Sequence, residues 1–368
     1  MENEHLAIEI QGEEADDLYP HLVSVEVEKE AGLTDTFAMQ LTLSCDHQGT
    51  WELLGDERLR PWKLITLRAG FGSADDTLLN GYITHMAPIF DPDPAACVLE
   101  IRGMDASVLM DRDEALKAWP DKKDSDIARE IFESHGFDTD VEETEVVHGE
   151  AVSTIIQRET DLQFLRRLAL RNGCDCYMDE GTGCFKKPNL NAAPQPVLAV
   201  HFGDETTVRS FSLSVNALGP GRVSMAQVDR LNKKVLSTTM KSNDAPSLGR
   251  LDASALAPSG IQAATLHLDR KVTTGQPEMD LFAQAIHRRA HWFVTGHGEI
   301  MGNHYGHVLK PRQTVPIKGI GETFSGLYAV TRVTHTFTDD GYTQRFTATR
   351  NALEPTGSES FSDAPFGL

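Results

Sequence analysis

Hydrophobic and polar residues alternate along much of the chain, a pattern typical of β-strands with one buried face. The clearest case runs from Leu327 to Arg350, as two strands that meet at Thr338-Asp339-Asp340-Gly341. The Asp-Gly pair supplies the positive φ angles that tight hairpin turns need. In the second strand, Tyr342, Gln344, Phe346 and Ala348 share one face, and Thr343, Arg345, Thr347 and Thr349 share the other.

A similar layout lies near the other end of the chain, from Gly81 to Gly103, with a turn at Asp91-Pro92-Asp93-Pro94. At an offset of about 247 residues, four apolar positions coincide, namely Ile83 with Val330, Met86 with Val333, Phe90 with Phe337 and Leu99 with Phe346. Two copies of one β-unit predict an internally duplicated scaffold. Chance similarity between two amphipathic hairpins is the alternative.

Residues 1–105 read as nearly all β, with about six strands. Alternation marks the strands around Leu6–Ile10, Val23–Val27, Phe37–Leu43 and Leu64–Ala69, before the hairpin at Gly81. We expect an antiparallel sheet or barrel with one solvated face.

The pattern changes to α/β over residues 106–195. A helix is predicted from Ser125 to Gly136, and a second between a capping box at Thr160 and Gln163 and a stop at Gly173. Residues 189–196 read as a linker.

Strand signals return at Phe211–Val215 and again in the last hundred or so residues. Between them, residues 241–276 predict loops and short elements, and a helix that follows Pro277 is expected to end near Gly296. The predicted domains are residues 1–105, 106–195, 196–240 with 297–355, an insert at 241–296, and a flexible tail at 356–368.

Charge narrows the range of functions. The 368 residues include 34 Lys or Arg and 55 Asp or Glu, a net charge of −21. This balance argues against phosphate-backbone binding, which depends on clustered cations, so no specific nucleic-acid binding is expected. The acidic surface is read either as a solubility device or as a wall that repels an anionic passenger.

The ends and the cysteines bear on location. The sequence has no run long and apolar enough to span a membrane, and its N-terminus lacks the features of a signal peptide. Five cysteines, an odd number, fit reduced thiols. We therefore expect folding in a reducing, cytosolic compartment.

Histidine is the best lead for chemistry. His287 and His291 are spaced to share one helical face, with His297, His304 and His307 close behind, and such a pair could hold Zn²⁺. The motif lacks the Glu of HExxH proteases, so exposed or interfacial histidines are favoured. Cys174, Cys176 and Cys184 lack the spacing of structural zinc sites and are expected to pack in a hairpin. No catalytic, cofactor-binding or metal site is predicted.

A family resemblance emerges from these residues. Tyr328–Phe337 with Gly341-Tyr342, Phe346 and Arg350-Asn351-Ala352 resembles the closing hairpin of phage late control D proteins, the baseplate hubs of contractile tails. Asp161–Ala169 with Gly173, Asp124–Ala128 and Phe324–Tyr328 resemble other parts of that family, which is similar to the N-terminal half of type VI secretion spike proteins.

The resemblance implies a β-rich mixed α+β fold, with two homologous antiparallel, tail-tube-like β-barrels and α/β insertions. Three subunits would then form a pseudo-sixfold ring that joins the hexameric inner tail tube to a separate trimeric spike, beside baseplate wedge proteins in an assembled tail or injection particle. The expected role is structural, without enzyme activity or cofactor. The alternative is a tail-tip-associated, metal-dependent cell-wall hydrolase.

Overall fold

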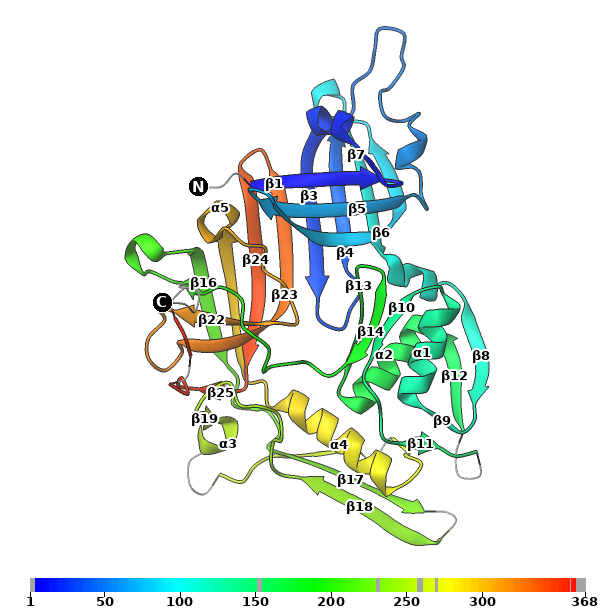
Figure 1. The fold of residues 1–368 in the computed structure, drawn as a ribbon, viewed down its shortest axis with the longest axis vertical. Coiled ribbons are helices and arrows are strands. Elements are labelled where there is room, and N and C mark those ends of the chain that lie inside the picture. The colour runs from blue at the N-terminus through cyan, green and yellow to red at the C-terminus, as the bar shows by residue number, and fades with distance from the viewer. Residues whose placement is uncertain are drawn as a thin grey trace.

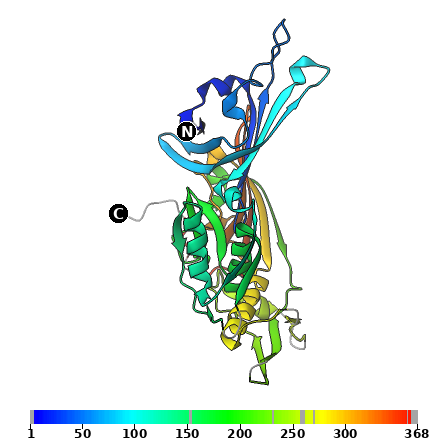
Figure 2. The same ribbon diagram turned by 90° about the vertical axis from the view of Figure 1, so that its right-hand side faces the viewer.

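The computed structural model describes residues 4–150, 154–229, 232–256, 261–268, 271–357 and 359–361. It is β-rich and its main feature is one large, almost wholly antiparallel sheet that does not close on itself. The molecule is elongated, with the N-terminal strands at one end and the β17–β18 hairpin at the other (Figures 1 and 2). Residues 358 and 362–368 of the expected flexible tail lie outside the described part. No described helix is both long and apolar enough to cross a membrane.

The N-terminal strands form what we call the first unit. Its strands are β1 (Glu4–Ile10), β3 (Leu22–Glu30), β4 (Thr36–Thr42), β5 (Leu64–Phe71), β6 (Ala74–Ile89) and β7 (Val98–Asp105), with β2 (Glu13–Glu14) at the edge. Their order in the sheet is β3-β4-β7-β6-β5-β1. The alternating residues of the sequence fill its core, where Val25, Met39, Leu67 and Ile101 have no exposed surface.

Later strands form the second unit. They are β15 (Leu198–Ala199), β16 (Val208–Val215), β21 (Val294–Met301), β22 (Thr314–Lys318), β23 (Gly326–Thr338) and β24 (Gly341–Arg350), with α5 (Gly302–Tyr305) between β21 and β22. Their order is β16-β21-β24-β23, with β22 on the other side of β23 and β15 beyond it. The second unit therefore has the same strand order as the first. Its strands β16, β21, β24, β23, β22 and β15 correspond in turn to β3, β4, β7, β6, β5 and β1. The units differ in that β15 runs parallel to β22, whereas β1 is antiparallel to β5.

The irregular points of the two units also coincide. A β-bulge lies between Leu22 and Ser24, opposite Leu41 and Gln40, and another between Val208 and Ser210, opposite Ile300 and Glu299. A further pair of bulges lies between Ile83 and His85 in β6 and between Val330 and Arg332 in β23. Bulges locally break the ladder, so matching positions are a stronger sign of common architecture than matching hydrophobic residues.

A strained residue repeats in the same way. Trp62 and Arg312 both have positive φ, at 71° and 68°, a region that side chains other than glycine seldom adopt. The N–H of Trp62 donates to the Ile83 carbonyl at 2.7 Å, and that of Arg312 donates to the Val330 carbonyl at 2.8 Å. Ile83 and Val330 are the two residues that the sequence comparison equates.

The structure confirms the C-terminal hairpin but changes two details. At its turn only Gly341 has positive φ, at 109°, and Asp340 does not. Met86 pairs with Ile101 and Val333 pairs with Phe346, so the counterpart of Phe346 is Ile101 and the predicted match with Leu99 is wrong. The first hairpin has the longer turn, which a comparison at one constant offset cannot accommodate.

An α/β insert follows the first unit. Its elements are β8 (Glu114–Trp119), β9 (Lys122–Lys123), α1 (Asp124–Ser134), β10 (Asp138–Val141), β11 (Val147–His148), β12 (Ile155–Thr160), α2 (Asp161–Asn172), β13 (Asp175–Asp179) and β14 (Thr182–Lys186). Thr160 caps α2 by accepting from the Gln163 N–H, and Gly173 ends it in the left-handed conformation, as predicted. The Gln163 side chain bonds Asp111 instead of completing a capping box.

A second insert separates β16 from β21. It contains β17 (Arg222–Asp229), β18 (Lys234–Met240), β19 (Leu251–Asp252), α3 (Ala253–Leu256), β20 (Thr265–His267) and α4 (Gln276–Ala290). β19 pairs with β25 (Ala352–Leu353), and β17 and β18 form a separate sheet with β20. The helix after Pro277 ends at Ala290, earlier than Gly296, because β21 already begins at Val294.

Candidate functional site: the free edges of the main sheet

The two units meet through one pair of strands, which we call the junction. The C-terminal part of β23 pairs with β3, from Arg332 opposite Glu30 to Thr338 opposite Ser24. Here the core-facing side chains are covered, because Val25, Val27 and Val333 have 0% and Phe337 has 8% of their surface exposed. The junction therefore merges the two units into one continuous sheet (Figure 1).

The strands that correspond to the junction strands have free edges at the two opposite ends of this arrangement. β16, the counterpart of β3, pairs only with β21 among the described strands. In β6, the counterpart of β23, the part after Thr84 pairs with β7 alone among the described residues. Each unit thus offers one strand edge of the kind that forms the junction.

Apolar side chains lie open along both free edges. Ile89 and Phe90 are 46% and 56% exposed, and Val215 is 41% exposed. Phe90 corresponds to the buried Phe337 of the junction, whereas Phe211 and Leu213, the counterparts of Val25 and Val27, are half-buried. An exposed apolar edge strand is a template for pairing with another chain.

The outer face of the main sheet, opposite its core, is rich in hydroxyl groups. It is hollowed over the second unit by a cavity of about 490 Å³ that includes Ser210, Ser212, Thr334 and Thr347. Charged residues on this face are largely paired, as Arg332 with Glu28, Arg345 and Arg209 with Glu299, and Arg102 with Glu100.

The histidine pair that the sequence singles out lies inside the protein. His287 is 0% and His291 is 7% exposed, so of the two settings expected for them, exposed or interfacial, the exposed one is wrong. Their rings are 4.1 Å apart, and His291 Nδ1 lies 2.8 Å from the His287 carbonyl. Burial, with a further effect of His291, lowers the pKa of His287 and keeps it neutral.

The other histidines do not join that pair. His297 lies on the outer face, where its Nδ1 is 3.1 Å from the Thr347 hydroxyl, and His304 and His307 are exposed. Within the described ranges, no three His, Cys, Asp or Glu side chains are grouped as a metal site would require.

The cysteines of the insert pack as predicted. Cys176 and Cys184 are buried in the β13–β14 hairpin, and Cys174 lies just before it. Burial raises the pKa of Cys176 to about 12, so this thiol is protonated and unreactive at neutral pH. All five cysteines are free thiols.

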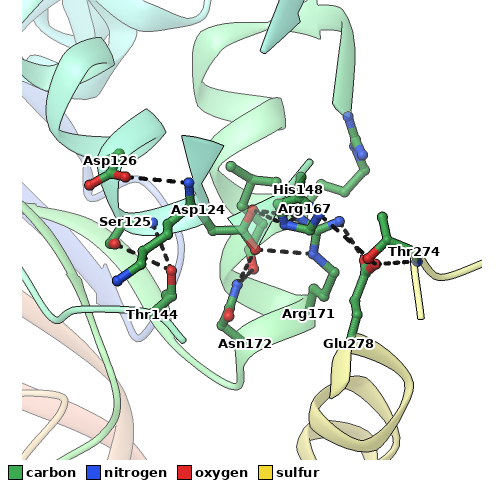
Figure 3. A network of polar contacts seen from close by, with 12 residues as sticks. Asp124, Ser125, Asp126, Thr144, His148, Arg167, Arg171, Asn172, Thr274 and Glu278 are labelled. Atoms are coloured by element: carbon green, nitrogen blue, oxygen red, sulfur yellow. Dashed lines mark hydrogen bonds and ion pairs between the residues drawn. The ribbon is translucent and has the colours of Figure 1, made fainter. Parts of the chain in front are cut away.

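A buried ionic network joins the first insert to α4 (Figure 3). Arg171 bridges two carboxylates, with Nε 3.1 Å from Asp124 and Nη1 2.9 Å from Glu278. Asn172 and His148 also bond Asp124, at 2.6 and 3.1 Å. Burial opposes ionisation of Asp124, but the contacts with His148 and Arg171 outweigh it and lower the pKa. Such satisfied networks fix the position of one segment against another.

The free edges were not predicted from the sequence. One signal for the edge in β6 is Pro88, because proline cannot donate to a ladder and is confined to edge strands or bulges. For β16 no comparable signal exists, since its Ser-Phe-Ser-Leu-Ser pattern would also suit an internal strand with one solvated face.

Solved structures with this fold are tail proteins and a secretion component. The 43 kDa tail protein of prophage MuSo2 from Shewanella oneidensis has a TM-score of 0.68 at 13% identity, covering 96% of this chain and all of that one. The tail protein of Neisseria meningitidis gives 0.66 at 12%, with coverages of 95% and 97%. The E. coli c3393 protein, a type VI secretion component, gives 0.54 at 14%, with coverages of 95% and 79%.

At such identities the likeness shows the fold, which is the fold of phage tail and type VI secretion proteins. The chain itself belongs to the family described as the Alg8 N-terminal domain, whose model matches residues 2–339. Comparison with the curated proteins gives no match.

Proposed function

We propose that the chain is a structural hub subunit of a contractile tail or injection system. Three copies form a pseudo-sixfold ring that joins the inner tail tube to a separate trimeric spike. The single observation that supports the ring is the pair of free edges, since each corresponds to one strand of the junction. A head-to-tail contact of this kind gives a ring when its rotation closes.

The two units are, in this proposal, a duplicated tail-tube-like barrel, which the sequence places at residues 1–105 and at 196–240 with 297–355. Because β17 and β18 belong to a separate sheet and β21 begins at Val294, we move the bounds of the second unit to 196–215 with 294–355. The inserts are then 106–195 and 216–293, and 356–368 is a tail. Matching bulges and matching strained residues support the duplication. Neighbouring copies would join the open sheets of their units into one sheet that runs around the ring.

The number three comes from the resemblance to late control D hubs, because three chains with two units each match a hexameric tube. The E. coli c3393 protein is described as similar to the T4 tail proteins gp27 and gp5, which is in line with a role in a tail or injection system. Baseplate wedge proteins are the other proposed neighbours. The subunit would fold in the bacterial cytoplasm and act without catalysis.

Co-expression with the tube and spike proteins of the same tail or injection system tests this role. Electron microscopy is expected to show a six-lobed ring that contains three copies of the chain between tube and spike. A ring with another number of copies, or a tube–spike complex that forms without the chain, contradicts the proposal.

A matched pair of variants shows whether the free edge is used. Ile89→Asp places a charge at the β6 edge, and Leu116→Asp places one at an 81% exposed position on β8, away from both edges. We expect Ile89→Asp to abolish incorporation into the ring and Leu116→Asp to leave it unchanged. Both variants should unfold like the wild type, because neither side chain is buried.

A further inference from the structure

The junction has a defined hydrogen-bond pattern. The N–H of Ala31 donates to the Thr331 carbonyl at 2.8 Å, so the residue after β3 points its backbone toward β23. Because successive residues of a strand point to opposite neighbours, Val25, Val27 and Lys29 also direct their N–H and C=O groups toward β23. His335 and Val27 therefore form a pair that exchanges two hydrogen bonds.

The same pattern can be transferred to the free edges. The matched bulges equate Ser24 with Ser210 and Arg332 with His85. Applied to the register of the junction, this equivalence sets His85 opposite Asn216, Ala87 opposite Ser214, Pro88 opposite Leu213 and Phe90 opposite Phe211. The exposed Phe90 and the half-buried Phe211 then cover one another, as Phe337 and Val25 do inside the chain.

Two features of the junction are missing from this pairing of β6 with β16, which we call the seam. Pro88 stands where His335 stands and has no N–H, so the pair Pro88–Leu213 can make only one of its two hydrogen bonds. The ion pair between Arg332 and Glu28 is also lost, because His85 and Ser214 occupy the corresponding positions. The seam between copies is thus expected to be weaker than the junction within the chain.

We propose that β16 of one copy pairs with the β6 edge of the next in the register of the junction, and that Pro88, His85 and Ser214 keep this seam too weak to close without a partner. The occupant of each free edge is a second copy of this chain. The inference rests on the proposed ring and adds its register and its dependence on the tube or spike. Subunits with such a weak seam would form a ring only when the tube or the spike is bound.

Disulfide trapping tests the register. Ala87 and Ser214 would form a non-hydrogen-bonded pair, whose Cα atoms lie about 4.5 Å apart, within the range that a disulfide spans. In a Cys45→Ser background, the double variant Ala87→Cys/Ser214→Cys is expected to give covalent dimers and trimers in the assembled complex. The control, Ala87→Cys/Ser212→Cys, is one pair out of register and should give none. Equal trapping of both pairs, or trapping of the control alone, overturns the register.

Restoring the junction chemistry tests the weakness. The triple variant Pro88→His/His85→Arg/Ser214→Glu returns one hydrogen bond and one ion pair to each seam. We expect its self-association constant, measured by light scattering without partners, to rise by about tenfold or more over the wild type. A control with His85→Lys alone lacks both the donor at position 88 and the carboxylate, and should behave like the wild type.

The outcomes separate this inference from the proposed function. A wild-type chain that forms trimers alone at micromolar concentration contradicts the weak seam, while the hub role stands. Rings in the complex without in-register trapping contradict the pairing. Absence of any ring in the presence of tube and spike contradicts the hub itself.

Discussion

The last strand of the first unit and the last strand of the second end at the same place in the common architecture but in opposite charges. β7 ends at Asp105 and β24 ends at Arg350, and the pairing of both strands makes these residues counterparts. Both are buried, at 4% and 0% exposure. Asp105 accepts from the N–H groups of Asp35 and Ser107, at 2.7 and 2.9 Å. Arg350 instead donates to backbone carbonyls.

The two side chains differ because the backbone segments that contact them present different groups. Asp105 starts the first insert, where a loop and a short helix present N–H groups that need an acceptor. Arg350 lies among loop carbonyls, those of Leu248, Phe324, Ser325 and Glu354, at 3.0 to 3.2 Å. A buried charge is tolerated where it satisfies several backbone groups at once. The two units thus share this position at the strand end, and the neighbouring segment determines whether its residue is an acceptor or a donor.

The largest effect is expected from Arg350→Met, which keeps the volume and removes every donor. Four carbonyls would be left without their partner in a buried site, at a cost of about 5 kcal/mol in the free energy of unfolding. Urea unfolding measures this loss. Hydrogen exchange should also rise in the segment around Leu248, because Arg350 holds it against the sheet.

The control for this variant is Arg345→Gln on the same strand, whose side chain is 62% exposed. Removal of its pair with Glu299 should change the free energy of unfolding by less than about 1 kcal/mol. Similar losses in the two variants would mean that Arg350 acts through general charge and not through the carbonyls.

The junction gives a second contrast, in which His335 is buried and its counterpart Pro88 is exposed. Burial, with Lys29 nearby, lowers the pKa of His335 to about 3, from 6.5 in an unfolded chain. Between these two pKa values the unfolded chain binds a proton at His335 and the folded chain does not. The free energy of unfolding therefore decreases as the pH falls below 6.5. Between pH 7 and pH 4 this group should remove about 3–4 kcal/mol from the free energy of unfolding.

His335→Asn, which does not titrate, should show a smaller loss over the same range. Measured against pH, the stability of the wild type should fall more steeply than that of the variant. His297→Asn, the same substitution at the exposed histidine of the outer face, serves as the comparison. Parallel curves for the wild type and His335→Asn would contradict a neutral buried His335.

Much of the fold was predictable from the sequence because the strands carry strict alternation. The hairpin from Leu327 to Arg350 and the cap at Thr160 follow from local signals alone. The helix after Pro277 was extended too far because Trp292, Phe293 and Val294 continue an apolar run that suits either a helix or a strand.

The candidate site was beyond the reach of the sequence for a different reason. The edges of β16 and β6 are defined by which strands do not pair with them, and pairing depends on contacts between distant residues. The histidines at 287 and 291 lie close together as predicted, but His291 follows the last residue of α4 and both side chains turn inward, which spacing alone does not decide. Opposite charges at Asp105 and Arg350 likewise hid their equivalence.

Asp105 provides the last test of the comparison, with the smallest expected effect and the opposite sign to His335. Burial and the nearby Asp35 raise the pKa of Asp105 to about 6, from 3.8 in an unfolded chain. The folded chain holds this proton more tightly, so the contribution of Asp105 to stability is fully present below pH 3.8. It is lost as the pH rises to about 6 and then stays constant, by up to about 3 kcal/mol in total.

The variant Asp105→Asn removes this titration and also one of the two acceptors. The free energy of unfolding of the wild type minus that of the variant should therefore decrease from pH 4 to pH 6.5 and stay level above it. Asp244→Asn is the control, because Arg288 lowers the pKa of that carboxyl to about 2 and its contribution is constant over this range. A difference for Asp105→Asn that grows with pH would mean that the backbone N–H groups of Asp35 and Ser107 stabilise the carboxylate more than burial opposes it. In that case Asp105 would match Arg350, because hydrogen bonds with backbone groups would keep both side chains ionised. The two strand ends would then differ only in the sign of their charge.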